Sequence, residues 1–315
     1  MSANLVFIPF PIVSHLAAAK PFDHSPQHET TDGHEDHFPE ELGVPSYVYF
    51  TSSAMSLQLF FHLQTLKDDH NHDFVEFKDS DFETTVPGYI NPVPARVWSV
   101  AVFEEDIGFS GLIRKFREAK GIMVNTFLEF EHEVIKSLCN DEKIPPVYPI
   151  GPILQDGQQH TDQNEKKHEE IINTGCFGEN QVKEIVVALE QSRTRFLWSL
   201  RKPPPKEKVE FAGECENPGE VLPKGFLERT VGFGKVIGWA PQLAVLAHPA
   251  IGGFVSHCGW NSILESVWSG VSIATWPLGA KQQANAFELV KEFNMTVEIK
   301  MDIRRIVMWL WVQRQ

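Results

Sequence analysis

Residues 239–282 read WAPQLAVLAHPAIGGFVSHCGWNSILESVWSGVSIATWPLGAKQ, and this stretch decides the expected fold. Glycines followed by β-favouring residues at 252–256 predict a buried strand. From Trp260 onward, apolar residues recur at the spacing of one helical face, and Gly270 marks the expected end of that helix. The stretch therefore predicts a strand, a turn at 257–259 and a helix, with polar side chains gathered at the junction.

The chemistry of this junction suits a phosphorylated ligand. A helix start presents backbone N–H groups and the positive end of the helix dipole, which together can hold a phosphate. His257 lies in the turn and can donate to the same anion, while Asn261 and Glu265 share a helical face where a carboxylate suits a sugar hydroxyl. Trp239 offers a flat ring on which a base can stack. The alternative is that these residues are ordinary α/β core.

The whole stretch resembles the C-terminal signature box of plant family 1 UDP-glycosyltransferases, which use a nucleotide sugar to glycosylate small acceptors. The motifs WAPQ, HPAIGGF, SHCGWNS and LES carry the resemblance, together with the final glutamine. By this resemblance, the uracil base and the ribose are bound by Trp239, Ala240, Gln242 and Glu265. The diphosphate and the sugar are bound, by the same resemblance, by His257, Gly259, Trp260, Asn261, Ser262 and Gln282.

One position of the expected site departs from the family. The residue before the final glutamine is usually acidic and accepts hydrogen bonds from sugar hydroxyls, whereas this chain has Lys281. Lysine donates hydrogen bonds but cannot accept them. The identity of the sugar is therefore left open, although glucose is the expected one. Ser272 and Gly279 also replace the usual proline and bulky residue.

Composition excludes several classes of partner. The 315 residues are enough for two domains, and 42% apolar residues support a sizeable core. A formal net charge of -14 argues against nucleic acid or an anionic membrane surface as a partner. An anionic ligand such as a UDP-sugar must then be held by local donors, against the overall field.

The cysteines and the N-terminus bear on location. The chain has four scattered cysteines without Cys-x-x-Cys spacing, which indicates neither a zinc site nor a redox pair but reduced cytosolic thiols. The apolar N-terminal run lacks a basic leader and is interrupted by Pro9 and Pro11, so no signal peptide is expected. No stretch approaches the length of a membrane span. We therefore expect a cytoplasmic, monomeric protein without a membrane partner.

The N-terminal part is expected to be incomplete. A strand at 5–9 leads to His15, which the resemblance identifies as the catalytic base, although a lone histidine after a strand is more often structural. Residues 20–41 are polar, acidic and rich in histidine; metal binding and a disordered insert are the alternatives, and the missing periodicity favours the insert. In the family this region holds several strand and helix pairs and the aspartate that orients the histidine. No residue is assigned that role.

Alternating apolar runs continue from residue 42. A first helix is expected to end near residue 67, and further helices are expected at 104–119, 127–138, 181–191 and 284–293. A strand is expected soon after residue 42, and further strands are expected at 121–126, 195–201 and 296–300. Glu129, Glu131 and Glu133 are expected to form a solvated helix face. The strand and Gly-Ser loop that open the family's second domain are reduced to a Cys-Phe-Gly remnant at 176–178.

Together these features predict an α/β fold with parallel sheets. The resemblance implies the GT-B architecture, in which two Rossmann-like domains face a cleft. The expected domains are an incomplete acceptor-side domain at 1–154, a linker at 155–170 and a UDP-sugar domain at 171–315.

Two functions are weighed. The first is transfer of a hexose from a UDP-sugar to a hydroxyl of a small plant metabolite such as a flavonoid, with no cofactor and no metal. The second is a truncated, catalytically silent homologue that retains at most nucleotide binding. A dinucleotide enzyme is the weakest reading, because the glycines at 232–238 lack the fingerprint spacing.

Overall fold

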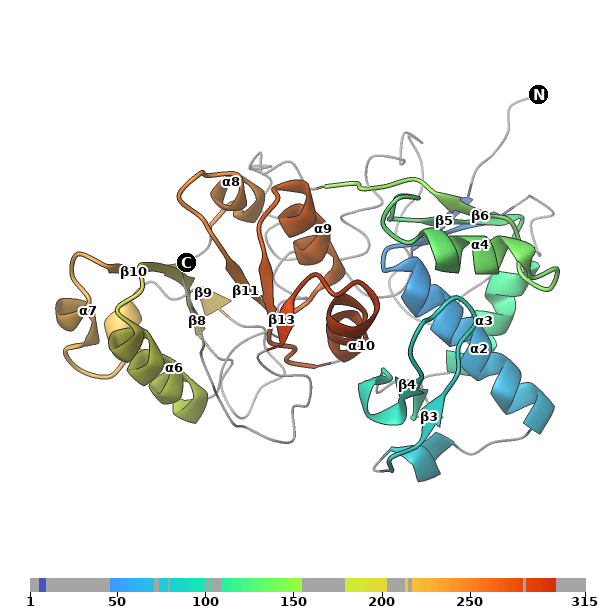
Figure 1. Ribbon diagram of the computed structural model, residues 1–315, viewed down its shortest axis with the longest axis horizontal. Helices are drawn as coiled ribbons and strands as arrows, with labels where there is room; N and C mark the ends of the chain where they lie inside the picture. The colour runs from blue at the N-terminus through green and yellow to red at the C-terminus, as the bar shows by residue number, and fades with distance from the viewer. Residues whose placement is uncertain are drawn as a thin grey trace. The chain divides into compact units, whose positions relative to one another are not determined.

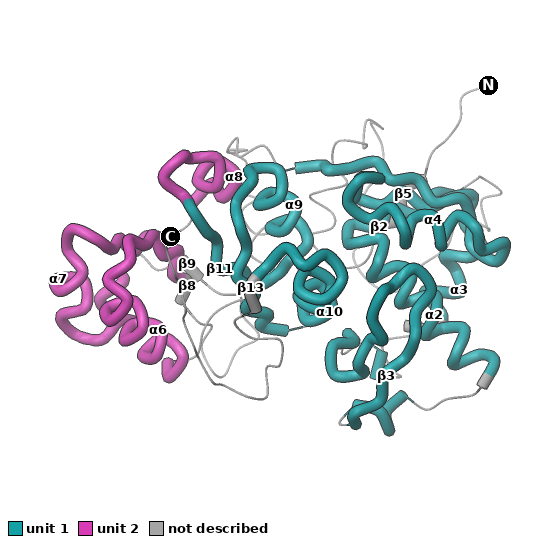
Figure 2. Tube along the Cα trace, in the orientation of Figure 1, with its two compact units in different colours: residues 1–155, 252–307 teal, residues 156–251, 308–315 magenta. Residues whose placement is uncertain are grey.

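The computed structural model describes residues 6–9, 46–70, 74–78, 80–99, 102–103, 109–154, 179–202, 213–214, 217–238, 240–279 and 282–298. The chain forms two compact units, coloured separately in Figure 2. Unit 1 combines residues 1–155 with 252–307, and unit 2 combines 156–251 with 308–315. Unit 1 thus joins segments that the sequence assigned to different domains.

A four-stranded parallel sheet forms the first part of unit 1 (Figure 1). Its strands, in spatial order, are β1 (Val6–Pro9), β2 (Ser46–Phe50), β5 (Gly121–Val124) and β6 (Val147–Pro149). The helices of this part are α2 (Ala54–His70), α3 (Phe109–Glu118) and α4 (His132–Asn140). Val48, Tyr49 and Phe50 are all buried, as expected for a strand covered on both faces. The predicted strands at 5–9 and 121–126 and the helix ending near 67 agree with these elements.

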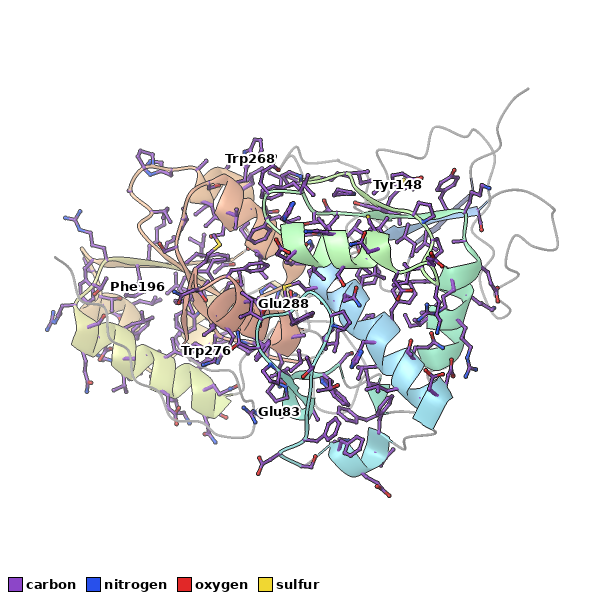
Figure 3. The ribbon with its side chains drawn as sticks, turned by 45° about the vertical axis from the view of Figure 1, so that its right-hand side comes forward. Glu83, Tyr148, Phe196, Trp268, Trp276 and Glu288 are labelled. Carbon is purple, nitrogen blue, oxygen red and sulfur yellow. The ribbon has the colours of Figure 1, made fainter. Side chains whose placement is uncertain are left out.

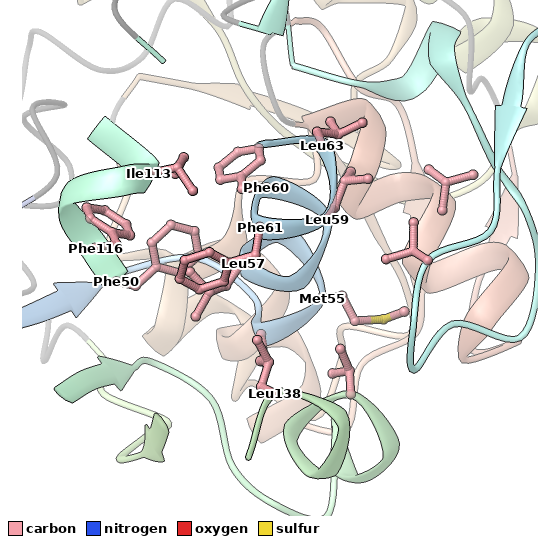
Figure 4. Close-up of a cluster of buried hydrophobic side chains, with 14 of the residues drawn as sticks. Phe50, Met55, Leu57, Leu59, Phe60, Phe61, Leu63, Ile113, Phe116 and Leu138 are labelled. Atoms are coloured by element: carbon pink, nitrogen blue, oxygen red, sulfur yellow. The ribbon is translucent and has the colours of Figure 1, made fainter. Parts of the chain in front are cut away.

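Helix α2 supplies the centre of the core. Leu57, Leu59, Phe60, Phe61 and Leu63 are all buried, so the helix is buried around its circumference rather than along one stripe (Figure 4). Truncating a leucine in such a site costs about 2–5 kcal/mol. Helix α2 therefore fixes the position of the residues at its own N-terminus, which include a polar cluster described below.

Two parts of the expected outline are wrong near α4. The helix expected from 127 begins only at His132, because Phe127 to Phe130 form a turn closed by the Phe130 N–H bonded to the Phe127 carbonyl (3.1 Å). Glu129 and Glu133 are exposed as expected, but Glu131 is only 2% exposed. Its carboxylate bonds elsewhere in unit 1, so Glu131 does not belong to a solvated face.

Short elements connect α2 to α3. Strands β3 (Glu83–Thr84) and β4 (Val93–Pro94) pair antiparallel, and one-turn helices η3 (Phe74–Phe77) and η4 (Ala95–Val97) flank them. Phe74, Phe77, Phe82 and Trp98 gather against the core through edge and stacked ring contacts. The proline-containing segment 82–94 is thus packed against the core of unit 1.

The second part of unit 1 is a three-stranded parallel sheet. Its elements are β11 (Phe254–Ser256), α9 (Trp260–Trp268), β12 (Ile273–Thr275), α10 (Gln282–Phe287), the π-helical turn η9 (Glu288–Glu292) and β13 (Val297–Glu298). Ile263, Leu264 and Ile273 pack with Phe127 and Phe130 of the first part. The predicted strand, turn and helix are therefore confirmed, and they are anchored on the first half of the chain.

Unit 2 is a smaller α/β layer. Its parallel strands β7 (Phe196–Ser199) and β10 (Gly234–Ile237) are accompanied by α6 (Glu179–Ser192), α7 (Phe226–Arg229), α8 (Gln242–Leu246), η8 (Pro218–Glu220) and the antiparallel pair β8 (Arg201–Lys202) and β9 (Gly213–Glu214). Val182, Val186 and Phe226 form its core. The predicted helix at 181–191 and strand at 195–201 agree with α6 and β7.

Among the described helices, none combines the length and the apolar character that a membrane span requires.

Candidate functional site

The turn between β11 and α9 presents the start of a helix without a side-chain cap. Gly259 is the N-cap residue, in an extended conformation (φ -64°, ψ 139°), and no side-chain hydrogen bond closes this end. The helix's own bonding starts where the Ile263 N–H donates to the Gly259 carbonyl (3.0 Å). The N–H groups of the three preceding residues are therefore not used within the helix, which is the arrangement that binds anions.

The backbone of Cys258, in the middle of the turn, adopts a left-handed conformation. Its φ is 64°, a region that costs a non-glycine residue about 1–2 kcal/mol. Its N–H donates to Ser256 Oγ (3.1 Å), and its carbonyl accepts from Asn285 Nδ2 (2.8 Å). Burial raises the pKa of the Cys258 thiol to about 12, so the thiol stays protonated and donates to the Ser256 carbonyl (3.4 Å). This cysteine is a structural donor and not a nucleophile.

His257 is held neutral beside the helix start. Desolvation lowers its pKa to about 4, so at neutral pH the imidazole carries one N–H donor and no charge. A methyl group added at Gly259 would lie 2.4 Å from His257 Nε2. The ring therefore packs directly on the N-cap glycine, where any other residue would displace it.

Three of the polar residues that the sequence assigns to the ligand lie in the first two turns of α9. Ser262 and Glu265 are buried, and Asn261 is partly exposed. The Oδ1 atom of Asn261 is buried without a hydrogen-bond partner among the described residues. Leaving such an acceptor unpaired costs about 1–3 kcal/mol. A ligand donor at this position would remove that cost.

The side chain of Trp260 belongs to the core. Its indole Nε1 donates to the Asn125 carbonyl (2.7 Å), and its ring stacks on Phe130 with centroids 5.9 Å apart. Asn125 in turn bonds the backbone of Ile153 through both ends of its amide. Only the backbone of Trp260 faces the helix start, so a sugar contact from this residue would have to use its N–H. At the other end of α9, Trp268 is 66% exposed (Figure 3).

Gln282 closes the turn that precedes α10. Its Oε1 accepts from the N–H groups of Leu278 (2.9 Å) and Gly279 (3.0 Å). The carbonyl end of this amide is therefore committed to the backbone, and its Nε2 is the group that could donate to a ligand.

The remaining residues that the sequence assigns to the UDP-sugar or to catalysis do not belong to the segments just described. Gln242 opens α8 in unit 2, and Ala240 precedes it by two residues. His15, Trp239 and Lys281 lie outside the described residues.

A buried polar cluster that the sequence did not reveal lies where α2 begins. The Glu131 carboxylate accepts from the backbone N–H groups of Ala54 (3.0 Å) and Met55 (2.8 Å), which are the first two residues of α2. Burial raises the pKa of Glu131 to about 7, although these hydrogen bonds oppose the rise. Glu131 thus caps a helix from a position 76 or more residues away in the chain.

Glu288 joins the same cluster from η9 (Figure 3). Its Oε1 accepts from Ser56 Oγ (3.3 Å) and from the Tyr89 hydroxyl (3.4 Å). Burial, and then the nearby charge of Glu131, raise the pKa of Glu288 well above its usual range. One sequence signal could have indicated this cluster: the run Thr51-Ser52-Ser53 places three hydroxyls between an apolar strand and an apolar helix.

Within the described part of the chain, no three His, Cys, Asp or Glu side chains gather where they could hold a metal ion.

Comparison with known proteins gives a consistent result. Residues 175–304 match the family described as UDP-glucoronosyl and UDP-glucosyl transferase. The UDP-glucose flavonoid 3-O-glucosyltransferase 6 of Fragaria ananassa is 54% identical over 84% of this chain and 60% of its own length. Anthocyanidin 3-O-glucosyltransferase 6 of Manihot esculenta is 53% identical over 84% of this chain and 72% of its own length.

A solved structure supports the same relationship. The UGT transferase from Siraitia grosvenorii, crystallised in complex with UDP, is 44% identical, covers 86% of this chain and 64% of its own, and has a TM-score of 0.76. The chain spans about three fifths of the length of the relative from Fragaria ananassa. The predicted α/β fold of GT-B type is confirmed by this likeness. The chain belongs to the plant family 1 UDP-glycosyltransferases.

Proposed function

We propose that this chain binds a UDP-sugar at the start of α9 and transfers the sugar, glucose being the expected one, to a hydroxyl of a small phenolic acceptor such as a flavonoid. The observation that carries the proposal is the uncapped helix start with a neutral imidazole packed on its N-cap glycine. The names of the relatives from Fragaria ananassa and Manihot esculenta, which specify flavonoid and anthocyanidin glucosylation, support the acceptor class.

The diphosphate is proposed to rest on the N–H groups at the start of α9, beside His257. A neutral imidazole donates one hydrogen bond without needing a counter-charge, and the helix dipole favours the anion. These donors also compensate the charge that develops on UDP as it leaves, which is where stabilisation increases the rate. The proposal needs no metal ion, because the same donors supply that compensation.

The rest of the UDP-sugar follows the family pattern. We propose that Glu265 takes the ribose hydroxyls, with Trp239, Ala240 and Gln242 around the base. Lys281 and the Nε2 group of Gln282 are proposed to face the sugar. Trp260 contributes its backbone N–H, since its indole is engaged with the Asn125 carbonyl.

His15 is proposed as the general base. It takes the proton of the acceptor hydroxyl while the acceptor oxygen bonds to the anomeric carbon from the face opposite UDP. The bond from that carbon to the diphosphate oxygen breaks, and UDP leaves with the electron pair. The sugar is therefore transferred with inversion.

For the domain organisation, we propose an acceptor-side domain at 1–154, a linker at 155–170 and a UDP-sugar domain at 171–315. The family match at 175–304, which spans parts of both compact units, supports this division. The scattered cysteines support a reducing, cytoplasmic location.

Calorimetric titration with UDP tests the binding step. Wild type is expected to bind, His257→Ala to bind at least tenfold more weakly, and the control His132→Ala, an exposed histidine on α4, to bind like wild type. Equal affinity of all three proteins would overturn the assigned site. Turnover of UDP-glucose with a flavonol panel, abolished in His15→Ala, tests the transfer step. Binding of UDP without turnover would establish the silent homologue instead.

A further inference from the structure

We infer that Asn285 is a positioning residue for the diphosphate turn: its side-chain amide holds Cys258 in the left-handed conformation that sets His257 against the start of α9. This inference rests on the proposed function, because its consequence is an effect on UDP binding. Asn285 itself touches neither His257 nor the helix start through any described hydrogen bond.

The Cys258 carbonyl needs this donor. Among the described residues, Arg193, Cys258 and Asn294 are the non-glycine residues with positive φ, and Cys258 is the one that is fully buried. Bulk water can satisfy an exposed carbonyl in such a turn, whereas a buried carbonyl needs a specific partner. The Nδ2 atom of Asn285 supplies the hydrogen bond at 2.8 Å.

The amide of Asn285 has one orientation that fits its surroundings. The residue is only 2% exposed, and its Oδ1 lies 3.4 Å from the Ser56 hydroxyl, whose single proton it shares with Glu288 Oε1. Turning the amide over would set its oxygen against the Cys258 carbonyl and lose that bond. The short contact with the Cys258 carbonyl therefore fixes the orientation of the amide and acts on the site, and the longer contact with Ser56 is secondary.

The effect on His257 follows from the tightness of the turn. Cys258 lies between His257 and Gly259, and the imidazole has so little room that a methyl group at Gly259 would lie 2.4 Å from it. A rotation of the Cys258 backbone out of the left-handed region therefore moves the imidazole away from the N-cap glycine. Removing the Asn285 donor leaves a buried carbonyl unpaired and favours that rotation.

The test compares two variants that remove different halves of the Asn285 contacts. Asn285→Leu keeps the branched shape but removes the donor to Cys258, and Ser56→Ala removes the other partner while leaving the donor in place. We expect the UDP dissociation constant, measured by calorimetry, to rise roughly tenfold or more in Asn285→Leu and to change less than about twofold in Ser56→Ala. Melting temperatures of both variants are recorded in parallel.

A second readout follows His257 itself. In NMR titrations of the imidazole C2 proton, His257 should titrate near pH 4 in wild type and Ser56→Ala. In Asn285→Leu its pKa should move up toward the ordinary value of 6.5, because the displaced ring regains solvent. A purely structural role would lower the melting temperature without moving this titration.

The outcomes separate the inference from the function on which it rests. Failure of the wild type to bind UDP would overturn the proposed function. Wild-type binding with equal affinity in Asn285→Leu, or an equal loss in Ser56→Ala, would overturn the role of Asn285 alone. If Asn285→Leu does not fold, Asn285→Ala, which also removes the donor, should show the same loss of UDP affinity, and unchanged affinity would contradict the inference.

Discussion

Replacing Glu288 with glutamine is predicted to make unit 1 progressively more stable than wild type as the pH rises. Burial and the charge of Glu131 raise the pKa of Glu288 well above its ordinary value of 4.5, so the folded protein keeps a proton that the unfolded chain releases near pH 4.5. The stability that this proton contributes is complete below the unfolded pKa and is lost as the pH rises toward the folded pKa. Glutamine has the same shape and no proton to lose.

The size of the effect follows from one proton. For each pH unit between the two pKa values, the free-energy difference between variant and wild type grows by about 1.4 kcal/mol. In a folding unit of this size, that difference corresponds to about 3–5 °C in Tm per pH unit. Glu131, with a pKa of about 7, and His257, with a pKa of about 4, also titrate, but they are present in both proteins. The comparison therefore reports the titration of the Glu131–Glu288 pair, while the contribution of His257 is common to both proteins.

Thermal unfolding followed by near-ultraviolet circular dichroism at pH 5.5, 6.5 and 7.5 measures this difference. The matched control is Glu133→Gln, which removes an exposed carboxylate from α4. The control should follow wild type at each pH, while Glu288→Gln should gain relative to both as the pH rises. Parallel curves for wild type and Glu288→Gln would mean that Glu288 is already ionised in the folded protein, which contradicts the buried cluster.

Three further predictions concern the turn and helix α9. Gly259→Ala should weaken UDP binding about tenfold by displacing the His257 ring, and calorimetry showing wild-type affinity would contradict the packing described here. Trp260→Phe should lower the free energy of unfolding by about 1–3 kcal/mol in denaturant titrations, since it leaves a buried carbonyl unpaired; an unchanged midpoint would count against that hydrogen bond. Peptide mapping after alkylation of the folded protein should find Cys139 modified and Cys258 protected, whereas equal modification would refute the burial of Cys258.

Much of the fold could be predicted because local patterns determine it. The run at 254–256, the turn and the apolar spacing of α9 gave the strand, turn and helix that the structure contains. Helix α2 and strand β5 could also be predicted, since both segments are rich in apolar residues and have clear ends. These elements depend on neighbours in the chain, which a sequence pattern reports directly.

The remaining features depend on residues that are distant in the chain. Glu131 follows the charge pattern of a solvated face, yet it caps α2 across more than 70 residues. Glu292 similarly accepts from Ile90 and Asn91, about 200 residues away. Such contacts join residues 252–298 to the first half of the chain in unit 1, and hydrophobic periodicity carries no information about them.

Within the site, the sequence identified the residue types but not how they are held. The motif predicted that His257 and the start of α9 would adjoin, and the structure brings them together. The left-handed conformation of Cys258 could not be expected, because glycine is the usual residue there. In the structure the Cys258 carbonyl accepts a hydrogen bond from Asn285, a residue beyond the signature stretch, and our inference assigns the conformation to this bond.

The most direct test of the account is to ask where UDP touches the protein. In amide NMR spectra of the isotopically labelled chain, UDP should shift the signals of Trp260, Asn261 and Ser262 saturably, and uridine, which lacks the diphosphate, should leave them largely unchanged. Unshifted amides at the start of α9 in the presence of saturating UDP would contradict the claim that this helix start holds the diphosphate.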